Sequence, residues 1–270
     1  METKDFFFEF SNQDRIDVFK SLYKSEKKHS EIEKELHISG SEVSRHLKRL
    51  REKSLVIKTR EGKYTISNIG KIFYWILDLF EVSLKHKEYF NTHDITSIPL
   101  YLILQLGELH TLELSTKTLQ NIELWSNLVK NSEQFIYAIS DQFQTSLLPI
   151  VEQNVYNQDL EIRALIDKSL LKSYNIPREW SEKFENPANF YKKLNIFENI
   201  RILEELHLSL VVSEKGGILF LSRDTTINYG QCLIDNHPSF VNWLKDLFMF
   251  YWNKGKSLKP FIKKELKSTH

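Results

Sequence analysis

The sequence predicts a mixed α+β and α/β protein, in which an N-terminal winged helix-turn-helix precedes a larger C-terminal α/β domain. Two observations predict this fold. Short helical patterns followed by a hairpin pattern occupy residues 1–67, in the order typical of a winged helix. Beyond residue 92, strand patterns alternate with helical ones, which is typical of a parallel sheet covered by helices.

Three short helices are expected first. Asn12–Ser25 has apolar residues at helical intervals after Ser11, a candidate N-cap. A second helix is expected after Ser30 and a third over Glu42–Lys53. One face of the third helix carries an apolar stripe, formed by Val43, Leu47 and Leu50.

A hairpin and a long helix follow. Two β-branched runs flank Glu61-Gly62, a two-residue signal for a tight turn. The helix expected over Asn68–Phe90 has more apolar surface than one small domain can bury. We therefore predict that its residues Tyr74, Trp75 and Leu79 form a homodimer contact, with packing against the C-terminal domain as the alternative.

The C-terminal pattern begins after a linker predicted at Thr92–Pro99. Strands are expected over Phe135–Ser140, Leu160–Ile166, Ile200–Leu203, Leu208–Ser213 and Gly217–Ser222, and helices over Lys117–Lys130, Ser146–Tyr156 and Phe240–Trp252. The predicted organisation is a winged helix-turn-helix domain at 1–67, a linking and dimerisation helix at 68–91, an α/β domain at 92–256 and a basic tail at 257–270.

Charge singles out the third helix and the hairpin. The chain's net charge is only +1, but residues 41–63 carry eight cations against three carboxylates. Outward side chains of this kind suit the major groove and the phosphates of duplex DNA. The predicted DNA-binding residues are Ser41, Ser44, Arg45, Lys48, Arg49, Lys58, Arg60 and Lys63. The alternative is a solvated helix face without a partner.

Residues 10–66 resemble ArsR-type and related archaeal winged-helix regulators, most clearly in ISGSEVSRHLKRLREKSLV. One departure is Ser54, where many relatives place glycine to end the helix. The recognition helix lacks the cysteine-rich motif of the metal-sensing members, so no metal site is expected there.

The remainder resembles archaeal regulators whose winged helix is followed by a methanogenesis-regulator middle domain. The resemblance rests on YTISNIGKIF, IPLYLILQLGEL and EQFIYAISDQFQTSLLPIV. It implies a phospholipase-D-like α/β fold used for sensing. Phospholipase D chemistry needs His-x-Lys followed by aspartate, but the one His-x-Lys here is His46-Leu47-Lys48, on the recognition helix, with Lys53 in the aspartate position. We therefore expect no enzyme activity, and no cofactor is implied.

A small-molecule or protein effector, sensed by the α/β domain, is the predicted signal. Ligands of open α/β sheets bind at the carboxyl ends of strands. That rule places the candidate pocket at Ser140, Asp141, Gln142, Asp167 and Lys168. The alternative is that Asp141 and Asp167 cap the following helices or line a solvated rim.

Composition limits the other classes of function. A single cysteine, Cys232, excludes an internal disulfide framework, and no apolar helical stretch is long enough to span a bilayer, so we expect a cytoplasmic protein without membrane contact. The leading hypothesis is a transcription regulator that binds double-stranded DNA. The alternatives are a phosphodiester-processing enzyme and a winged helix used for protein or RNA contact.

Overall fold

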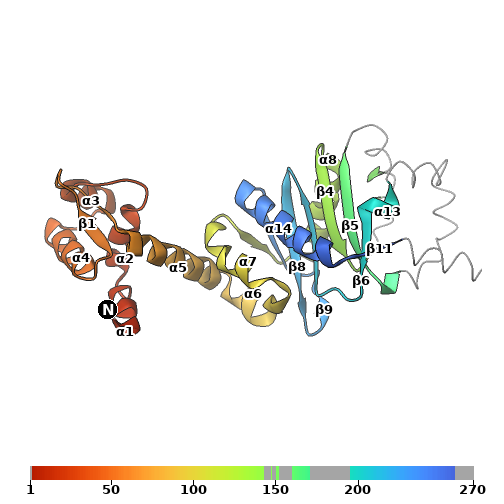
Figure 1. Cartoon of the computed structure of the whole chain (residues 1–270), viewed down its shortest axis with the longest axis horizontal. Coiled ribbons are helices and arrows are strands. Elements are labelled where there is room, and N and C mark those ends of the chain that lie inside the picture. Colours follow the sequence, from red (N-terminus) through yellow and green to blue (C-terminus); the bar gives the residue numbers. More distant parts are fainter. Residues whose placement is uncertain (1, 143–146, 148–149, 152–159, 171–194, 259–270) are drawn as a thin grey trace, which may run out of the picture. The chain divides into compact units, whose positions relative to one another are not determined.

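The computed structural model describes residues 2–142, 147, 150–151, 160–170 and 195–258 (Figure 1). Contacts divide the chain into two units, Met1–Glu81 and Val82–His270. The division falls inside the segment 68–91 that the sequence assigned to a linking helix. Residues 259–270 of the predicted basic tail, and most of the predicted helix Ser146–Tyr156, lie outside the described residues.

The first unit has the winged-helix order of elements that the sequence predicted. Its helices and strands are α1 (Thr3–Glu9), α2 (Gln13–Ser21), α3 (His29–Leu36), α4 (Gly40–Glu52), β1 (Val56–Lys58), β2 (Tyr64–Ile66) and α5 (Asn68–Lys85), which crosses into the second unit. Strands β1 and β2 pair antiparallel, with Val56 opposite Ile66. Lys27 adds a bridge to Tyr64 on the other side of β2, which leaves β1 at the edge of the wing.

Several helix ends differ from the prediction. Asn12, not Ser11, caps α2, because its side chain accepts a hydrogen bond from the Arg15 amide at 3.0 Å. Helix α3 begins at His29, before Ser30. Helix α1 was not predicted. Its FFF run has no helical alternation of polar and apolar residues to reveal it.

Helices α2, α3 and α4 close one apolar core with the wing and α5. Its buried members are Val18, Phe19, Leu22, Ile32, Val43, Leu47, Leu50, Leu55, Val56, Ile66 and Leu77. Complete burial of each large aliphatic side chain stabilises the fold by about 1.5–3 kcal/mol. The core therefore fixes the side of α4 that points away from solvent.

Two backbone positions shape the path around the wing. Ser54, which lies between α4 and β1, adopts the left-handed conformation with φ of 61°. A non-glycine residue pays about 1–2 kcal/mol for that conformation. Gly70 at the start of α5 lies against the wing, because an added Cβ would come within 2.3 Å of the Leu55 carbonyl oxygen and 2.6 Å of the Ile66 Cγ2 atom. Glycine therefore permits the close approach of α5 to the wing.

The second unit is an α/β domain built on one large sheet. Its helices are α6 (Lys87–Thr92), η1 (Ile95–Ser97), α7 (Leu100–Leu104), η2 (Leu106–Glu108), α8 (Thr118–Asn131), α13 (Ile196–Asn199) and α14 (Pro238–Lys254). Its strands are β3 (Glu113–Ser115), β4 (Phe135–Ser140), β5 (Glu161–Asp167), β6 (Ile200–Leu203), β7 (Leu208–Ser213), β8 (Gly216–Arg223), β9 (Thr226–Ile227), β10 (Cys232–Asp235) and β11 (Lys256–Ser257).

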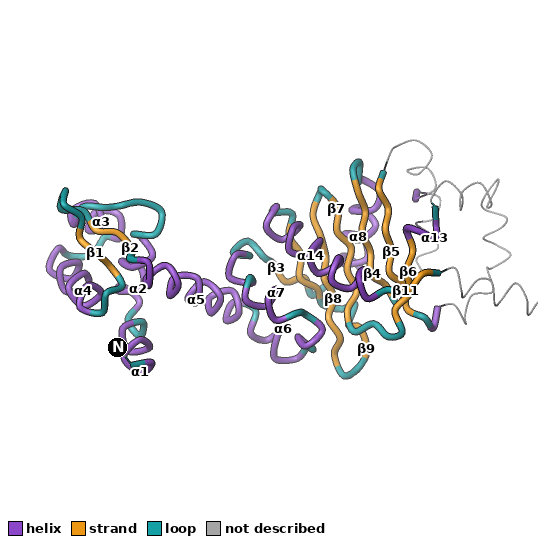
Figure 2. The backbone as a smooth tube through the Cα atoms, in the orientation of Figure 1, coloured by secondary structure: helices purple, strands orange, loops and turns teal. Residues whose placement is uncertain are grey.

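The strand order within the described residues is β11-β6-β5-β4-β7-β8-β10-β3, with β9 paired to β8 (Figure 2). Strands β4, β5 and β6 are parallel, as the strand–helix alternation predicted. The two predicted strands over Leu208–Ser213 and Gly217–Ser222 correspond to β7 and β8, which form an antiparallel hairpin beside β4. Strands β10 and β3, which the sequence analysis did not identify, extend the sheet beyond that hairpin.

Helices cover both faces of the sheet. Ile136 of β4 packs in one cluster with Trp125 and Val129 of α8. Its neighbour Tyr137 stacks on Phe248 of α14 at 4.8 Å between ring centroids. Because successive strand residues point to opposite faces, α8 and α14 lie on opposite sides of the sheet.

The prediction of a linker over Thr92–Pro99 is wrong. The Asp94 amide donates to the Ser222 carbonyl oxygen at 2.8 Å, and the Tyr251 hydroxyl donates to the Ser97 carbonyl oxygen at 2.5 Å. The segment is thus built into the second unit. The helix predicted over Asn68–Phe90 is interrupted at His86, which precedes α6.

Candidate nucleic-acid interface

Helix α4 presents a polar face because its other face is buried. Ser39 caps the helix in a reciprocal capping box with Glu42. Val43, Leu47 and Leu50 lie in the core with at most 2% of their surface exposed. His46 shares this buried face, and burial, helped by the charges of Arg45 and Arg15, lowers its pKa. The opposite face is left to solvent.

The predicted contacts Ser41, Ser44, Arg45 and Lys48 lie on the exposed face. The side chains of Arg45 and Lys48 are 62% and 77% exposed. Each has one distant carboxylate partner, Glu42 at 3.8 Å and Glu52 at 3.9 Å. Exposed pairs of this length contribute little to stability, so phosphate or base contacts can replace them at small cost.

The wing contributes the other predicted cations. Lys58 lies over the Tyr64 ring at 5.4 Å, and Arg60 is exposed in the turn between the strands. Lys63 is 3.5 Å from Glu61 and its side chain is 34% exposed. Gly62, with φ of 81°, provides the left-handed residue that the turn requires.

Arg51 is a candidate contact that the sequence analysis missed. It lines a groove of about 550 Å³ between α4 and β1, together with Lys48, Glu52, Ser54, Val56, Ile57 and Lys58. Three cations therefore line the space between the recognition helix and the wing. The spacing of Lys48 and Arg51 at i and i+3 was the available signal, since such residues are neighbours on a helix surface.

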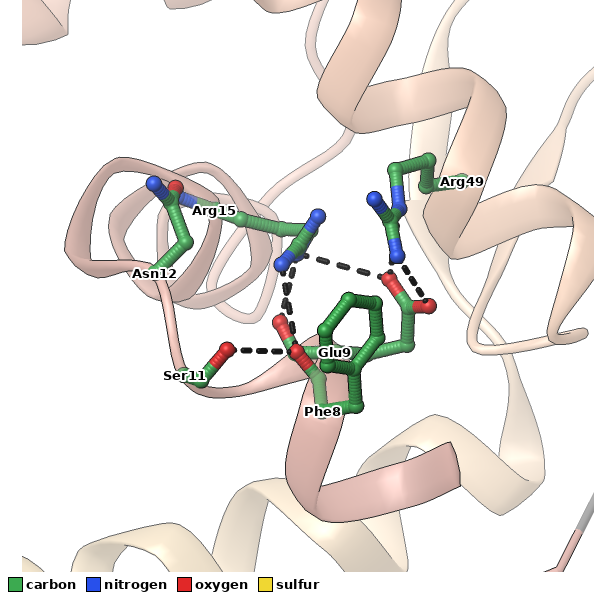
Figure 3. A network of polar contacts seen from close by, with 6 residues as sticks. All are labelled: Phe8, Glu9, Ser11, Asn12, Arg15 and Arg49. Carbon is green, nitrogen blue, oxygen red and sulfur yellow. Dashed lines mark hydrogen bonds and ion pairs between the residues drawn. The ribbon is translucent and has the colours of Figure 1, made fainter. Parts of the chain in front are cut away.

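Arg49 belongs to a buried ion network rather than to the free cationic face (Figure 3). Its Nε and Nη2 donate to the two carboxylate oxygens of Glu9 at 3.0 and 2.7 Å. The Phe8 ring lies 5.1 Å from the guanidinium carbon. The predicted phosphate contact of Arg49 is untested, but two of its donors are already used within the unit.

Arg15 completes this network from α2. Its Nε donates to the Glu9 carbonyl oxygen at 2.5 Å and lies 3.4 Å from a Glu9 carboxylate oxygen. Its Nη2 donates to the Phe8 carbonyl oxygen at 3.3 Å. The Glu9 side chain is 3% exposed. One buried carboxylate thus joins α1, α2 and α4.

Comparison with known proteins agrees with this geometry. Residues 12–58 match the family model described as "Bacterial regulatory protein, arsR family". The first unit carries an ArsR-type winged helix-turn-helix. The match runs from the N-cap of α2 to the end of β1. Helix α1 and its Glu9 therefore lie outside the matched segment of the ArsR-type unit.

Similarity over the whole chain is weak. A solved structure of TrmBL2, described as an archaeal chromatin protein with a novel mode of DNA binding, aligns at 15% identity over 92% of this chain and 94% of that chain, with a TM-score of 0.39. The dimethyltransferase RosA from Streptomyces davawensis aligns at 9% identity over 73% and 62%, with a TM-score of 0.23. Both scores are too low to support an argument. The comparison with curated proteins found no match.

The predicted dimer residues lie on α5 in different environments. Tyr74 is half-buried and stacks on Tyr23 at 3.7 Å between ring centroids. Trp75 is 56% exposed and donates from its indole nitrogen to the Tyr23 hydroxyl at 3.1 Å. Leu79 is half-buried. The stacked ring of Tyr74 already has its partner within the ArsR-type unit, whereas Trp75 presents apolar surface to solvent.

The predicted effector residues lie at the carboxyl ends of two neighbouring parallel strands, β4 and β5. Ser140 is opposite Ile166 in the register of β4 and β5, which brings the ends of both strands together. Asp141 accepts a hydrogen bond from the Tyr229 hydroxyl, whose pKa is raised by burial and by Asp141. The Ser140 hydroxyl donates to the Gln142 carbonyl oxygen at 2.7 Å.

The residues at the carboxyl end of β5 form hydrogen bonds and an ion pair with neighbouring residues. Asp167 accepts hydrogen bonds from the Ser169 and Leu206 amides at 2.7 and 3.2 Å. Lys168 pairs with Glu204 at 2.6 Å. Both carboxylate oxygens of Asp167 thus accept backbone hydrogen bonds, while Asp141 accepts one from a distant tyrosine that the sequence did not single out.

Within the described residues, no group of three or more histidine, cysteine, aspartate or glutamate side chains is arranged to hold a metal ion. Among the same residues, no helix is both long and apolar enough to cross a membrane.

We predict that Glu9→Gln destabilises the ArsR-type unit by about 3 kcal/mol near neutral pH, because two buried or half-buried guanidinium groups lose their counter-charge. Thermal unfolding followed by circular dichroism measures the loss. Glu33→Gln, at an exposed position of α3, is the matched control and should change little. Equal stabilities of the two variants would contradict a structural role for Glu9.

The difference in stability between the wild type and Glu9→Gln should also depend on pH. Burial raises the pKa of the Glu9 carboxyl, but the hydrogen bond from Arg49 and the charges of Arg15, Arg49 and Lys53 outweigh burial and leave the pKa below its ordinary value. A lowered folded-state pKa stabilises the fold above the unfolded pKa of about 4.3, and this contribution disappears as the pH falls through the folded value. The gap between the wild type and Glu9→Gln should therefore close in acid.

Proposed function

We propose that this protein is a transcription regulator that binds double-stranded DNA sequence-specifically through α4 and the wing. The observation that supports this proposal is the exposed cationic face of α4 inside the segment that matches the arsR family. Helix side chains in the major groove read base edges, and flanking cations contact phosphates. Arg45 is the proposed guanine contact, while Lys48, Arg51, Lys58, Arg60 and Lys63 are proposed to lie along the backbone.

The second unit is proposed to act as a sensor with a non-catalytic phospholipase-D-like fold. Its parallel strands β4, β5 and β6, covered on both faces by helices, agree with such a fold. The sequence beyond residue 82 contains no His-x-Lys pair. A sensor must bind its effector with different affinities in two conformations.

We also propose that α5 mediates a homodimer, since two copies place two recognition helices at matching half-sites. Trp75 is the predicted residue that is most exposed, and α5 shows further apolar surface at Ile69, Ile72 and Phe80, each more than 40% exposed. Tyr74, stacked on Tyr23, supports this surface from within the unit.

Arg45→Ala is expected to weaken specific DNA binding by about 1–3 kcal/mol, because a bidentate base contact is lost. A gel shift with DNA from upstream of the protein's own gene measures the effect, and Lys130→Ala in α8 is the control. Unchanged affinity and footprint would reject this orientation of α4. Absence of any duplex binding by the wild type would favour the protein- or RNA-binding alternative.

The dimer is tested by the mass in solution. Light scattering at micromolar concentration should give twice the chain mass for the wild type and the single-chain mass for a Trp75→Glu, Ile72→Glu double variant, because charge at an apolar interface is strongly disfavoured. Lys71→Ala, at an exposed position of the same helix, should remain dimeric. A monomeric wild type would remove the proposal.

The effector site is tested by a thermal-shift screen of small molecules on the whole chain. A compound that binds beside Asp141 should raise the melting temperature of the wild type, and Asp141→Asn should reduce that increase because a carboxylate charge is lost while the Tyr229 hydrogen bond can be kept. Asp224→Asn, at an exposed position, is the control. An increase that Asp141→Asn leaves intact would place the pocket elsewhere.

A further inference from the structure

The two serines on the exposed face of α4 are each hydrogen-bonded inside the ArsR-type unit. The hydroxyl of one accepts its hydrogen bond, whereas the hydroxyl of the other donates. Ser41 and Ser44 are one helical turn apart and both are exposed. A hydroxyl can donate one hydrogen bond and accept two, so its internal partner decides which capacity remains for DNA. The inference below rests on the proposed DNA-binding function.

Ser44 is held by a histidine at the start of α3. The Nε2 atom of His29 lies 2.9 Å from the Gly40 carbonyl oxygen and 2.9 Å from the Ser44 Oγ. A carbonyl oxygen can only accept, so Nε2 carries the proton and the Gly40 contact fixes this tautomer. A protonated Nε2 has no lone pair to receive the Ser44 proton. The Ser44 oxygen therefore accepts, and its own proton remains available to donate.

Ser41 is hydrogen-bonded to the helix-capping residue, and here the serine of the exposed face is the donor. The Ser39 hydroxyl donates to the Glu42 carboxylate at 2.8 Å, and the hydrogen bonds from the Ser39 hydroxyl and amide lower the pKa of Glu42 and keep it ionised near neutral pH. The Ser39 proton is thereby used. The Ser41 and Ser39 hydroxyl oxygens lie 3.0 Å apart, so Ser41 is the donor in this pair. The lone pairs of Ser41 remain available.

We propose that the recognition helix presents a fixed hydrogen-bond polarity to DNA, with Ser41 as an acceptor and Ser44 as a donor, and that His29 is the positioning residue for Ser44. Phosphates and most major-groove base atoms are acceptors, and they match Ser44. The major-groove donors are the amino groups of adenine and cytosine. Ser41 should therefore favour adenine or cytosine, whereas an unconstrained serine hydroxyl would accept any base or a phosphate.

The coupling of His29 to Ser44 is tested on a duplex selected in vitro by the wild-type chain. Fluorescence anisotropy at constant salt should show roughly fivefold weaker binding for His29→Ala and for Ser44→Ala, and no further loss in the double variant, because both changes remove one oriented hydrogen bond. His29→Gln keeps an N–H donor and should recover most of the affinity. His37→Asn, at the other end of α3, is the control.

Modified duplexes identify the partner atoms. If Ser44 donates to a phosphate, one methylphosphonate should weaken wild-type binding and leave Ser44→Ala unaffected, and if it donates to a base, a 7-deazapurine should do the same. For Ser41, replacing the amino group of one adenine or cytosine by hydrogen should weaken the wild type but not Ser41→Ala. Losses that persist in the serine variants overturn the proposed polarity.

The tautomer is tested without DNA. In the whole chain with ¹⁵N-labelled histidine at neutral pH, the His29 resonances, assigned by their loss in His29→Gln, should show the proton on Nε2. A proton on Nδ1 overturns the inference, as do additive losses from His29→Ala and Ser44→Ala. Failure of the wild type to select any duplex would instead reject the proposed function, and the inference with it.

Discussion

The candidate nucleic-acid interface depends on one constraint. Helix α4 must bury one of its faces and can therefore expose only the other. Val43, Leu47 and Leu50 are nearly inaccessible to solvent, and each contributes about 1.5–3 kcal/mol by leaving water. Rotating α4 would expose this stripe and bury Arg45 and Lys48, and burying unpaired charges is far more costly than exposing apolar surface. The core of the ArsR-type unit thus determines which side chains can meet a nucleic acid.

The same packing determines which cationic side chains are paired with a buried carboxylate and which remain exposed. Glu9 brings a carboxylate into the space between α1, α2 and α4, and Arg15 and Arg49 turn toward it. Arg45 and Lys48 have only distant exposed partners and stay available. Two arginines four positions apart on the same helix, Arg45 and Arg49, therefore lie in different environments, because only Arg49 is within reach of a buried counter-charge.

Much of the fold could be predicted from local patterns. The apolar stripe of α4, the hairpin around Gly62 and the parallel strands β4, β5 and β6 all follow from periodicity and turn residues. Local patterns could not identify partners that are remote in sequence. Arg49, predicted as a DNA contact, pairs with Glu9, which is 40 positions away, and Tyr74, predicted as a dimer contact, stacks on Tyr23, which follows α2.

The sequence by itself determined the order of the winged-helix elements from α2 to β2, the buried stripe of α4 and the cationic character of the third helix and wing, because these depend on neighbours within one or two turns of the chain. The tertiary structure alone decided which cations lack a close partner, which aspartate accepts backbone hydrogen bonds and which hydroxyl proton is already used. Such outcomes depend on hydrogen-bond partners brought together from separate elements, and no local pattern encodes their meeting.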